Sequence, residues 1–164
     1  MQRKEDRMAD DVTISNKIML LKGIEIFESL SVSELAAIAS VVEEIDCTPG
    51  DVIIQEGTVG DTMYLVVKGE VSVIKDLGEI NEIEIDRIKA GDYFGEMALF
   101  EDAVRSVSIR IEEACRFMVL HKQEFKELVR EYPQIALEIC KVLSGRIRNL
   151  HTKIEKHKYC NAEI

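Results

Sequence analysis

The sequence predicts a mainly β domain, an antiparallel barrel or sandwich of short strands with helices before and after it. Six short segments rich in β-branched residues follow one another without a helical pattern between them. Turn-forming residues such as Pro49-Gly50, Gly57 and Gly69 separate these segments. Short strands in this arrangement favour antiparallel sheets over alternating strand and helix units. The 164 residues, of which 46% are hydrophobic, suffice for one domain with a sizeable core.

The helices that precede the strands follow a charged segment. Residues 1–15 offer little to bury, and we expect a disordered lead or a linker there. The apolar residues between Ile18 and Phe27 predict a short helix. Ser31 and Glu34 have the spacing of a capping box, which predicts the start of a second helix. The apolar residues of that helix, from Leu35 to Val42, fall on one face.

The strands and the closing helices complete the domain, which we expect to span residues 16–158 with a tail at 159–164. The expected strands cover residues 52–54, 63–67, 71–74, 82–86, 107–111 and 116–120. A helix is expected over 122–132, and Pro133 suits the first turn of the next helix. In that last helix an apolar seam recurs every three or four residues, at Ile139, Leu143, Ile147, Leu150 and Ile154. Such a seam packs on one partner helix, or on the strands of its own domain.

Charge and cysteine content exclude several classes of function. A net charge of −10 argues against nucleic acid or an anionic membrane as a direct partner, because both are negatively charged. The four cysteines are far apart and contain no Cys-x-x-Cys pair, which favours free thiols in a reducing compartment. The first residues lack the pattern of a secretory signal, and no apolar run approaches membrane-spanning length. We expect a cytoplasmic location, unless the chain is one piece of a longer membrane-attached protein.

The stretch between the expected strands 82–86 and 107–111 carries the chemistry. Gly95 allows the backbone to approach a ligand closely, and a short helix beginning near Glu96 would direct unpaired amides at an anion. Arg105, nine residues after Glu96, offers a rigid positive fork to a phosphate oxygen. A carboxylate beside an anion site fits a ligand that also carries a hydroxyl, and a sugar phosphate satisfies both residues. Taken singly, Arg105 is also compatible with an ordinary salt bridge, and Glu96 with a helix N-terminal acid.

Two motifs give this stretch a specific resemblance. Phe94-Gly-Glu-Met-Ala-Leu, with eight residues between Glu96 and Arg105-Ser106, resembles the phosphate-binding cassette of cyclic-nucleotide-binding domains. That family includes kinase regulatory subunits, cyclic-nucleotide-gated channels and bacterial catabolite activator proteins. The upstream run from Gly50 to Val73 resembles the family's roll signature, so the likeness covers about residues 20–155. It implies an antiparallel β-roll, a double-stranded β-helix of jelly-roll type, with N-terminal helices and C-terminal lid helices.

The resemblance implies a role for each matching residue. Glu96 would accept a hydrogen bond from the ribose 2′-hydroxyl with help from the Gly95 amide, and Arg105 would pair with the cyclic phosphate. The amides of Ala98 and Ser106 would complete the phosphate cradle. The remaining expected ligand-binding residues are two further members of the cassette, Met97 and Val107, and two on the inner wall of the roll, Val73 and Ile85. The last helix, from about Pro133, would be a lid that moves when ligand fills the pocket.

The implied function is a regulatory module without catalysis or cofactor, whose ligand is a cyclic purine nucleotide, cyclic AMP ahead of cyclic GMP. An attached or separate effector would read the lid movement, and the seam of the last helix suggests a homodimer. A degenerate member that serves as an interaction or dimerisation module is the alternative. It gains support from Val107, where alanine is usual, and from the negative charges of Glu101 and Asp102. Val104 in place of a common proline affects only the rigidity of the loop. A cupin-type metalloenzyme is disfavoured, because the three histidines lie outside the expected strands.

Overall fold

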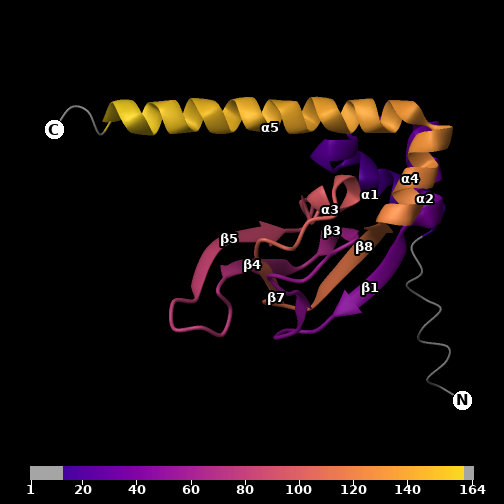
Figure 1. The fold of residues 1–164 in the computed structure, drawn as a ribbon. Coiled ribbons are helices and arrows are strands. Elements are labelled where there is room, and N and C mark those ends of the chain that lie inside the picture. The colour runs from indigo at the N-terminus through magenta and orange to yellow at the C-terminus, as the bar shows by residue number, and fades with distance from the viewer. Residues whose placement is uncertain (1–12, 161–164) are drawn as a thin grey trace, which may run out of the picture.

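The computed structural model describes residues 13–160 (Figure 1). Most of the expected lead, residues 1–12, and residues 161–164 of the expected tail lie outside the described part. Helix α1 (Ile14–Lys22) begins two residues inside the segment expected to be a lead, where the Thr13 hydroxyl accepts from the Asn16 amide. The single helix expected over 18–27 is interrupted at Gly23, a poor helix former, and resumes as the 3₁₀ turn η1 (Glu25–Phe27).

The capping box expected at Ser31 is confirmed at the start of α2 (Val32–Val41). The Ser31 amide donates to the Glu34 carboxylate at 2.8 Å, and the Glu34 amide donates to the Ser31 hydroxyl at 3.3 Å. These two bonds satisfy amides that the helix itself leaves without partners. The apolar face of α2 is buried through Leu35, Ile38 and Ala39, as the spacing of these residues predicts.

The strands form two four-stranded antiparallel sheets, which confirms the expected β-roll with flanking helices. The first sheet has the order β1 (Glu43–Cys47), β8 (Cys115–His121), β3 (Thr62–Lys68) and β6 (Tyr93–Phe94). The second has the order β2 (Val52–Ile54), β7 (Ser108–Ile111), β4 (Glu70–Lys75) and β5 (Ile83–Lys89). All six expected strands are present, together with two that were not expected, β1 and the two-residue β6.

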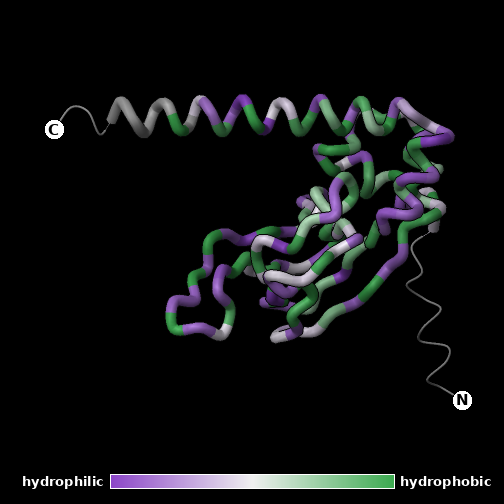
Figure 2. Tube along the Cα trace, in the orientation of Figure 1, coloured by the Kyte–Doolittle hydropathy of each residue, from purple (hydrophilic) through white to green (hydrophobic). Residues whose placement is uncertain are grey.

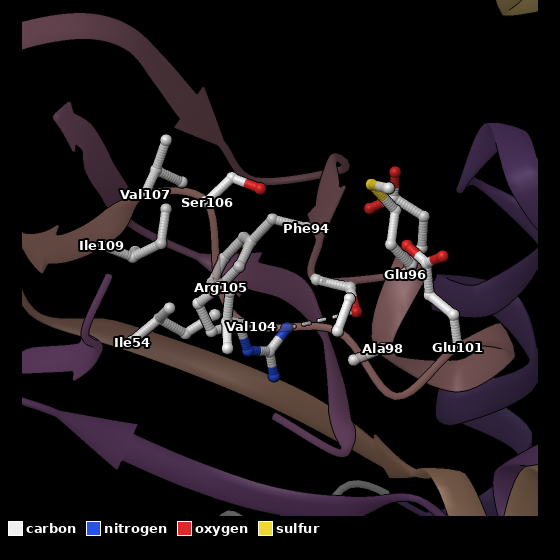
Figure 3. Close-up of a pocket in the computed structure, with 13 residues that line it drawn as sticks. Ile54, Phe94, Glu96, Ala98, Glu101, Val104, Arg105, Ser106, Val107 and Ile109 are labelled. Atoms are coloured by element: carbon white, nitrogen blue, oxygen red, sulfur yellow. Dashed lines mark hydrogen bonds between the residues drawn. The ribbon is translucent and has the colours of Figure 1, made fainter. Parts of the chain in front are cut away.

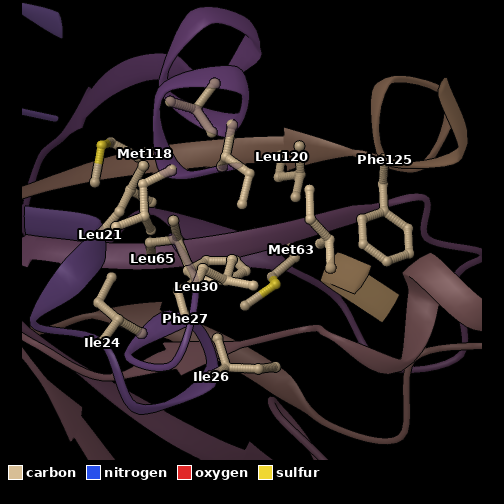
Figure 4. Packing of buried hydrophobic residues seen from close by; sticks show 14 of the residues in the cluster. Leu21, Ile24, Ile26, Phe27, Leu30, Met63, Leu65, Met118, Leu120 and Phe125 are labelled. Atoms are coloured by element: carbon tan, nitrogen blue, oxygen red, sulfur yellow. The ribbon is translucent and has the colours of Figure 1, made fainter. Parts of the chain in front are cut away.

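The first sheet is buried on both faces. Alternate residues of β3 and β8 belong to two different hydrophobic clusters, one on each face. Met63, Leu65, Met118 and Leu120 pack against the helices (Figure 4). The intervening residues of the same strands, among them Val66, Phe117 and Val119, pack against the second sheet. Their apolar runs lack the alternation of a half-exposed strand for this reason. The second cluster lies beside the loop that contains Gly95 and Arg105.

The chain ends in α4 (Lys122–Glu131) and the long helix α5 (Pro133–Cys160), with Pro133 at the first helical position as expected. Figure 1 shows α5 extending well beyond the rest of the domain, and hydrophobic residues recur along it (Figure 2). The apolar seam divides into two parts: Ile139 is fully buried against the domain, whereas Ile147, Leu150 and Ile154 are more than half exposed. Within residues 13–160, no helix has both the length and the apolar character needed to span a membrane.

Candidate functional site

A cavity of about 220 Å³ lies where β6, the short helix α3 (Met97–Phe100) and the start of β7 meet (Figure 3). Its wall contains seven of the nine expected ligand-binding residues, namely Gly95, Glu96, Met97, Ala98, Arg105, Ser106 and Val107. The loop between α3 and β7 returns Arg105 to the side of Gly95, although ten positions separate them in sequence. The cassette motif therefore forms one wall of one cavity.

The guanidinium of Arg105 is held by neutral oxygen atoms. Its Nη2 donates to the Thr62 carbonyl at 2.7 Å and to the Thr62 hydroxyl at 3.1 Å, and its Nη1 donates to the Gly95 carbonyl at 3.3 Å. Within the described part of the chain, no carboxylate lies within ion-pair distance of this guanidinium. Burial lowers the pKa of Arg105 below its ordinary value, although an arginine remains charged at neutral pH. Arg105 is thus a half-buried, fixed positive charge, and the acids whose charge acts on it, Asp61 and Glu96, form no ion pair with it.

Two glycines make room for this guanidinium. A Cβ atom at Gly60 would overlap the Arg105 side chain, and one at Gly95 would lie 2.8 Å from Arg105 Nη1 and 2.9 Å from the Thr62 carbonyl oxygen. Gly95 also has φ +79°, a conformation that residues with a Cβ rarely adopt. The position of Arg105 is therefore determined by three residues, Gly60, Thr62 and Gly95, of which the sequence analysis identified only Gly95 as part of the site.

Glu96 lines the same cavity as Arg105 and makes no hydrogen bond or ion pair with it. In Figure 3 the Glu96 side chain and the Arg105 guanidinium lie well apart, so a ligand that touches both must extend between them. Glu96 is the N-cap of α3. The Ala98 amide, expected in the phosphate cradle, donates to the Gly95 carbonyl at 3.2 Å, the same carbonyl that accepts from Arg105.

The acidic residues of the cassette loop differ in their placement. Asp102 is almost fully exposed and forms an ion pair with Lys122 at 2.6 Å, which lowers the pKa of its carboxyl. Its charge is therefore directed at α4. Glu101 lines the cavity. Val107 also lines the cavity, where its side chain joins the apolar cluster between the sheets.

Val73 and Ile85, expected to contact the base, do not line the cavity. Val73 pairs with Ile109 on β7 and is buried in the cluster between the sheets. Ile85 lies at an irregularity in the β4–β5 pairing, between the partners of Val73 and Ile74, and its side chain is 54% exposed. Contact of these two residues with a base stays a prediction.

Five apolar residues of the cavity wall were not among the expected ligand-binding residues, namely Ile54, Phe94, Ala103, Val104 and Ile109. Phe94 stacks on Tyr64 with ring centroids 5.1 Å apart. Ile54 comes from β2, and the antiparallel pairing of β2 with Ile109 on β7 brings it to the cavity. The alternating pattern of these strands indicated that their apolar residues are buried, but gave no sign of which ones border a hollow.

A second set of contacts joins the cassette to α5. The Arg146 guanidinium lies 4.3 Å above the centroid of the Tyr93 ring and donates to the Glu25 carboxylate at 2.9 Å. Tyr93 directly precedes the cassette in β6, and Glu25 belongs to η1. Burial raises the pKa of Tyr93 to about 12, and its hydroxyl has no hydrogen-bond partner among the described residues. Arg146 therefore bridges the last helix, the N-terminal helical segment and the strand before Gly95.

Comparison with known proteins places this geometry in context. Human cGMP-dependent protein kinase 2 is 33% identical over 140 residues, which cover 83% of this chain and 18% of that protein. A cAMP-dependent protein kinase regulatory subunit from Hypocrea atroviridis is 35% identical over 109 residues, covering 66% of this chain and 22% of that protein. The chain thus spans about a fifth of the length of these two relatives.

Solved structures show the same architecture. The regulatory domain of Toxoplasma gondii PKA, crystallised with cAMP, has a TM-score of 0.70 at 26% identity, over 83% of this chain and 50% of that one. The catabolite activator protein of Thermus thermophilus has a TM-score of 0.71 at 25% identity, over 82% of this chain and 63% of that one. The sequence pattern that defines the cyclic nucleotide-binding domain family matches residues 44–132, more than half of the chain. This chain therefore belongs to the cyclic nucleotide-binding domain family.

Proposed function

We propose that this chain is a regulatory sensor that binds a cyclic purine nucleotide in the cavity beside Arg105, prefers cyclic AMP to cyclic GMP, and catalyses no reaction itself. The observation that carries the proposal is the half-buried Arg105 guanidinium, which is fixed by neutral oxygens and has no counter-ion in the described part of the chain. A buried charge without a partner is costly, and a bound anion offsets that cost. A cyclic phosphate brings one negative charge and oxygen acceptors for the guanidinium fork.

Glu96 supplies the second polar contact in this proposal. Its carboxylate lines the cavity at a distance from Arg105, so phosphate and ribose can occupy the space between the two groups. A carboxylate only accepts hydrogen bonds at neutral pH, and a ribose 2′-hydroxyl is a suitable donor. The two side chains together select a ligand that has an anion at one end and a hydroxyl at the other.

Replacement of Glu96 by alanine is expected to remove the preference for cyclic AMP over its 2′-deoxy analogue. We expect the chain to bind cyclic AMP about 10- to 100-fold more tightly than 2′-deoxy cyclic AMP, because a hydrogen bond to a charged acceptor contributes about 1.5–3 kcal/mol. In Glu96→Ala the two affinities should agree within about threefold. Calorimetric titration of both nucleotides measures the ratio.

Glu101→Ala is the matched control, since it removes the other carboxylate of the cavity wall. It should preserve the discrimination against the deoxy analogue. If Glu96→Ala discriminates as well as the unmodified chain, Glu96 does not contact the 2′-hydroxyl.

The preference for cyclic AMP follows from the apolar lining of the cavity. Ile54, Val107 and Ile109 offer no hydrogen bonds, and the Ser106 hydroxyl is at an exposed position. Guanine carries more hydrogen-bonding groups than adenine on the edge that differs between the two bases. Their removal from water without replacement costs free energy, so adenine is favoured in this cavity. The relatives themselves include kinases named for either nucleotide.

The signal would pass to α5 through Arg146, which contacts both Tyr93 and Glu25. A cation over an aromatic ring contributes about 0.5–2 kcal/mol, enough to favour one helix position over another. In Arg146→Ala we expect the nucleotide-induced change in amide hydrogen exchange along α5 to shrink by more than half. Affinity for cyclic AMP should change far less.

Arg148→Ala is the control for this prediction, because Arg148 lies on the same helix and its side chain has no hydrogen bond or ion pair in the described structure. If the exchange response of Arg146→Ala equals that of Arg148→Ala, Arg146 does not transmit the signal to α5.

The exposed seam at Ile147, Leu150 and Ile154 would pair two copies of the chain in a homodimer, or dock on an effector. Sedimentation that shows a monomer at high concentration, with and without nucleotide, would contradict the homodimer.

A second candidate is the same fold without a ligand, serving as an interaction or dimerisation module. Two observations favour it: Glu101 adds negative charge to the cavity wall, and the Val107 side chain, bulkier than alanine, lines the same cavity as Arg105. The variant Val107→Ala separates the two candidates. The sensor predicts a change in cyclic AMP affinity within about threefold, whereas a gain above about tenfold favours a pocket that valine blocks.

A further inference from the structure

Two cysteines from distant parts of the chain are direct partners in the first sheet. Cys47 ends β1, Cys115 begins β8, and the antiparallel register places them opposite each other. Opposite residues on antiparallel strands point to the same face, with Cα atoms about 4.5–5.5 Å apart. Both side chains accordingly pack in the cluster between the two sheets. A disulfide needs Cα atoms about 4.4–6.8 Å apart, so the separation that this register implies lies within the required range.

The pair is also within reach of small molecules. Cys47 and Cys115 both line a cavity of about 370 Å³ that shares no lining residue with the cavity beside Arg105. Cys47 is partly exposed, whereas Cys115 is only 3% exposed. The Cys115 sulfur lies 3.5 Å from the Glu70 carbonyl oxygen. Rotation about the Cα–Cβ bond of Cys115 would release this contact and turn the sulfur toward Cys47.

We propose that Cys47 and Cys115 are an oxidisable dithiol, which hydrogen peroxide converts to a reversible disulfide. The Cys47 thiolate attacks one peroxide oxygen, the O–O bond breaks, and a sulfenic acid and one water form. The Cys115 thiol then attacks the Cys47 sulfur, the S–O bond breaks, and the second water leaves with the thiol proton. The two thiols lose two electrons and two protons, and peroxide is reduced to two waters. A dithiol reductant reverses the reaction by thiol–disulfide exchange.

The surroundings of the pair set its reactivity. Burial raises the pKa of both thiols, and the nearby acids raise that of Cys47 further, so little thiolate is present at neutral pH. Oxidation should therefore be slow at neutral pH and accelerate as the pH rises toward the thiol pKa. The charged groups that line the cavity or act on the two thiols are Asp46, Asp51, Lys68, Glu113 and Arg116.

The disulfide has a predictable effect on stability. It would close a loop that runs from β2 to β7 and contains every residue of the cavity beside Arg105. A cross-link across a loop of this length restricts the unfolded chain, and should raise the melting temperature by about 5–15 °C. This inference does not depend on nucleotide binding.

The test uses the full chain with Cys140→Ser and Cys160→Ser, which leaves the pair as the only cysteines. After treatment with hydrogen peroxide, we expect thiol titration in denaturant to fall from two thiols to none, and peptide mass mapping to find the Cys47–Cys115 link. The melting temperature should rise by the stated amount and return to its starting value with dithiothreitol. The further variant Cys47→Ser, or Cys47→Ala should the serine variant fold poorly, should show no rise.

Three outcomes would overturn the proposal. In the first, both thiols remain titratable in the folded protein at peroxide concentrations that oxidise the unfolded chain. In the second, mass mapping finds Cys47 linked to a second chain. In the third, Cys47 ends as a sulfinic acid without any link to Cys115.

Discussion

Replacement of Arg105 by leucine is expected to weaken cyclic AMP binding about 100-fold or more, a loss of about 3 kcal/mol. Arg105 is the one basic residue among those lining the cavity, and its guanidinium already occupies a fixed position. Leucine keeps much of the side-chain volume and removes both the charge and the donor fork. The phosphate would then be buried without a counter-charge. Calorimetric titration of the variant measures the loss.

Two further variants make the result specific. Arg110→Leu is the matched control, because Arg110 pairs with Glu82 and Glu112 and does not line the cavity. It should bind cyclic AMP like the unmodified chain. Arg105→Lys retains a positive charge without the planar fork. Its affinity for cyclic AMP should lie between that of Arg105→Leu and that of the unmodified chain. Circular dichroism checks that Arg105→Leu still folds, since the Thr62 carbonyl loses its donor. Unchanged affinity in folded Arg105→Leu would exclude Arg105 from the binding site.

The substitution Gly60→Ala should abolish most of the binding of cyclic AMP, although we expect no contact between residue 60 and the ligand. Gly60 lies outside the cassette, and its φ is not in the left-handed region that disfavours alanine. A methyl group there would overlap the Arg105 guanidinium, which must leave its contacts with Thr62 and Gly95. We expect a loss of about 30- to 100-fold in affinity for cyclic AMP, close to that of Arg105→Leu.

Gly145→Ala provides the control for the glycine substitution. Gly145 lies inside α5, where an added methyl group meets only the end of Arg148, at 3.9 Å. Alanine in a helix interior is favoured over glycine by about 0.5–1 kcal/mol, so this variant should be slightly more stable and bind normally. Normal binding by Gly60→Ala would show that the position of Arg105 seen here is not the one that the ligand requires.

Most of the fold could be predicted because β3 and β8 carry long apolar runs, and because capping residues such as Ser31 mark helix ends. β1 was missed for a physical reason. Its sequence, Glu-Glu-Ile-Asp-Cys, contains three acids, and two of them are neutralised by residues far along the chain. Glu44 pairs with Lys17 at 3.2 Å, and Asp46 pairs with Arg116 at 2.8 Å. No local pattern could show these partners.

The site likewise contains residues that a local motif reveals and residues that only the fold brings to it. The residues from Gly95 to Val107 are close in sequence and could be recognised as one motif. Thr62 and Gly60 act on Arg105 from the start of β3, more than 40 positions earlier, and Ile54 reaches the cavity only through the pairing of β2 with β7. The seam of α5 was recognised as apolar. Its division into a buried part at Ile139 and an exposed part beyond Leu143 depends on where the domain ends.

Calorimetric titration of the unmodified chain with cyclic AMP, beside cyclic GMP, tests the central claim most directly. A guanidinium that lines a cavity and has no ion-pair partner among residues 13–160 predicts saturable heat for one nucleotide per chain, with tighter binding of cyclic AMP. Absence of saturable heat with either nucleotide at about 1 mM, where even a binding free energy near −4 kcal/mol is detectable, would contradict it.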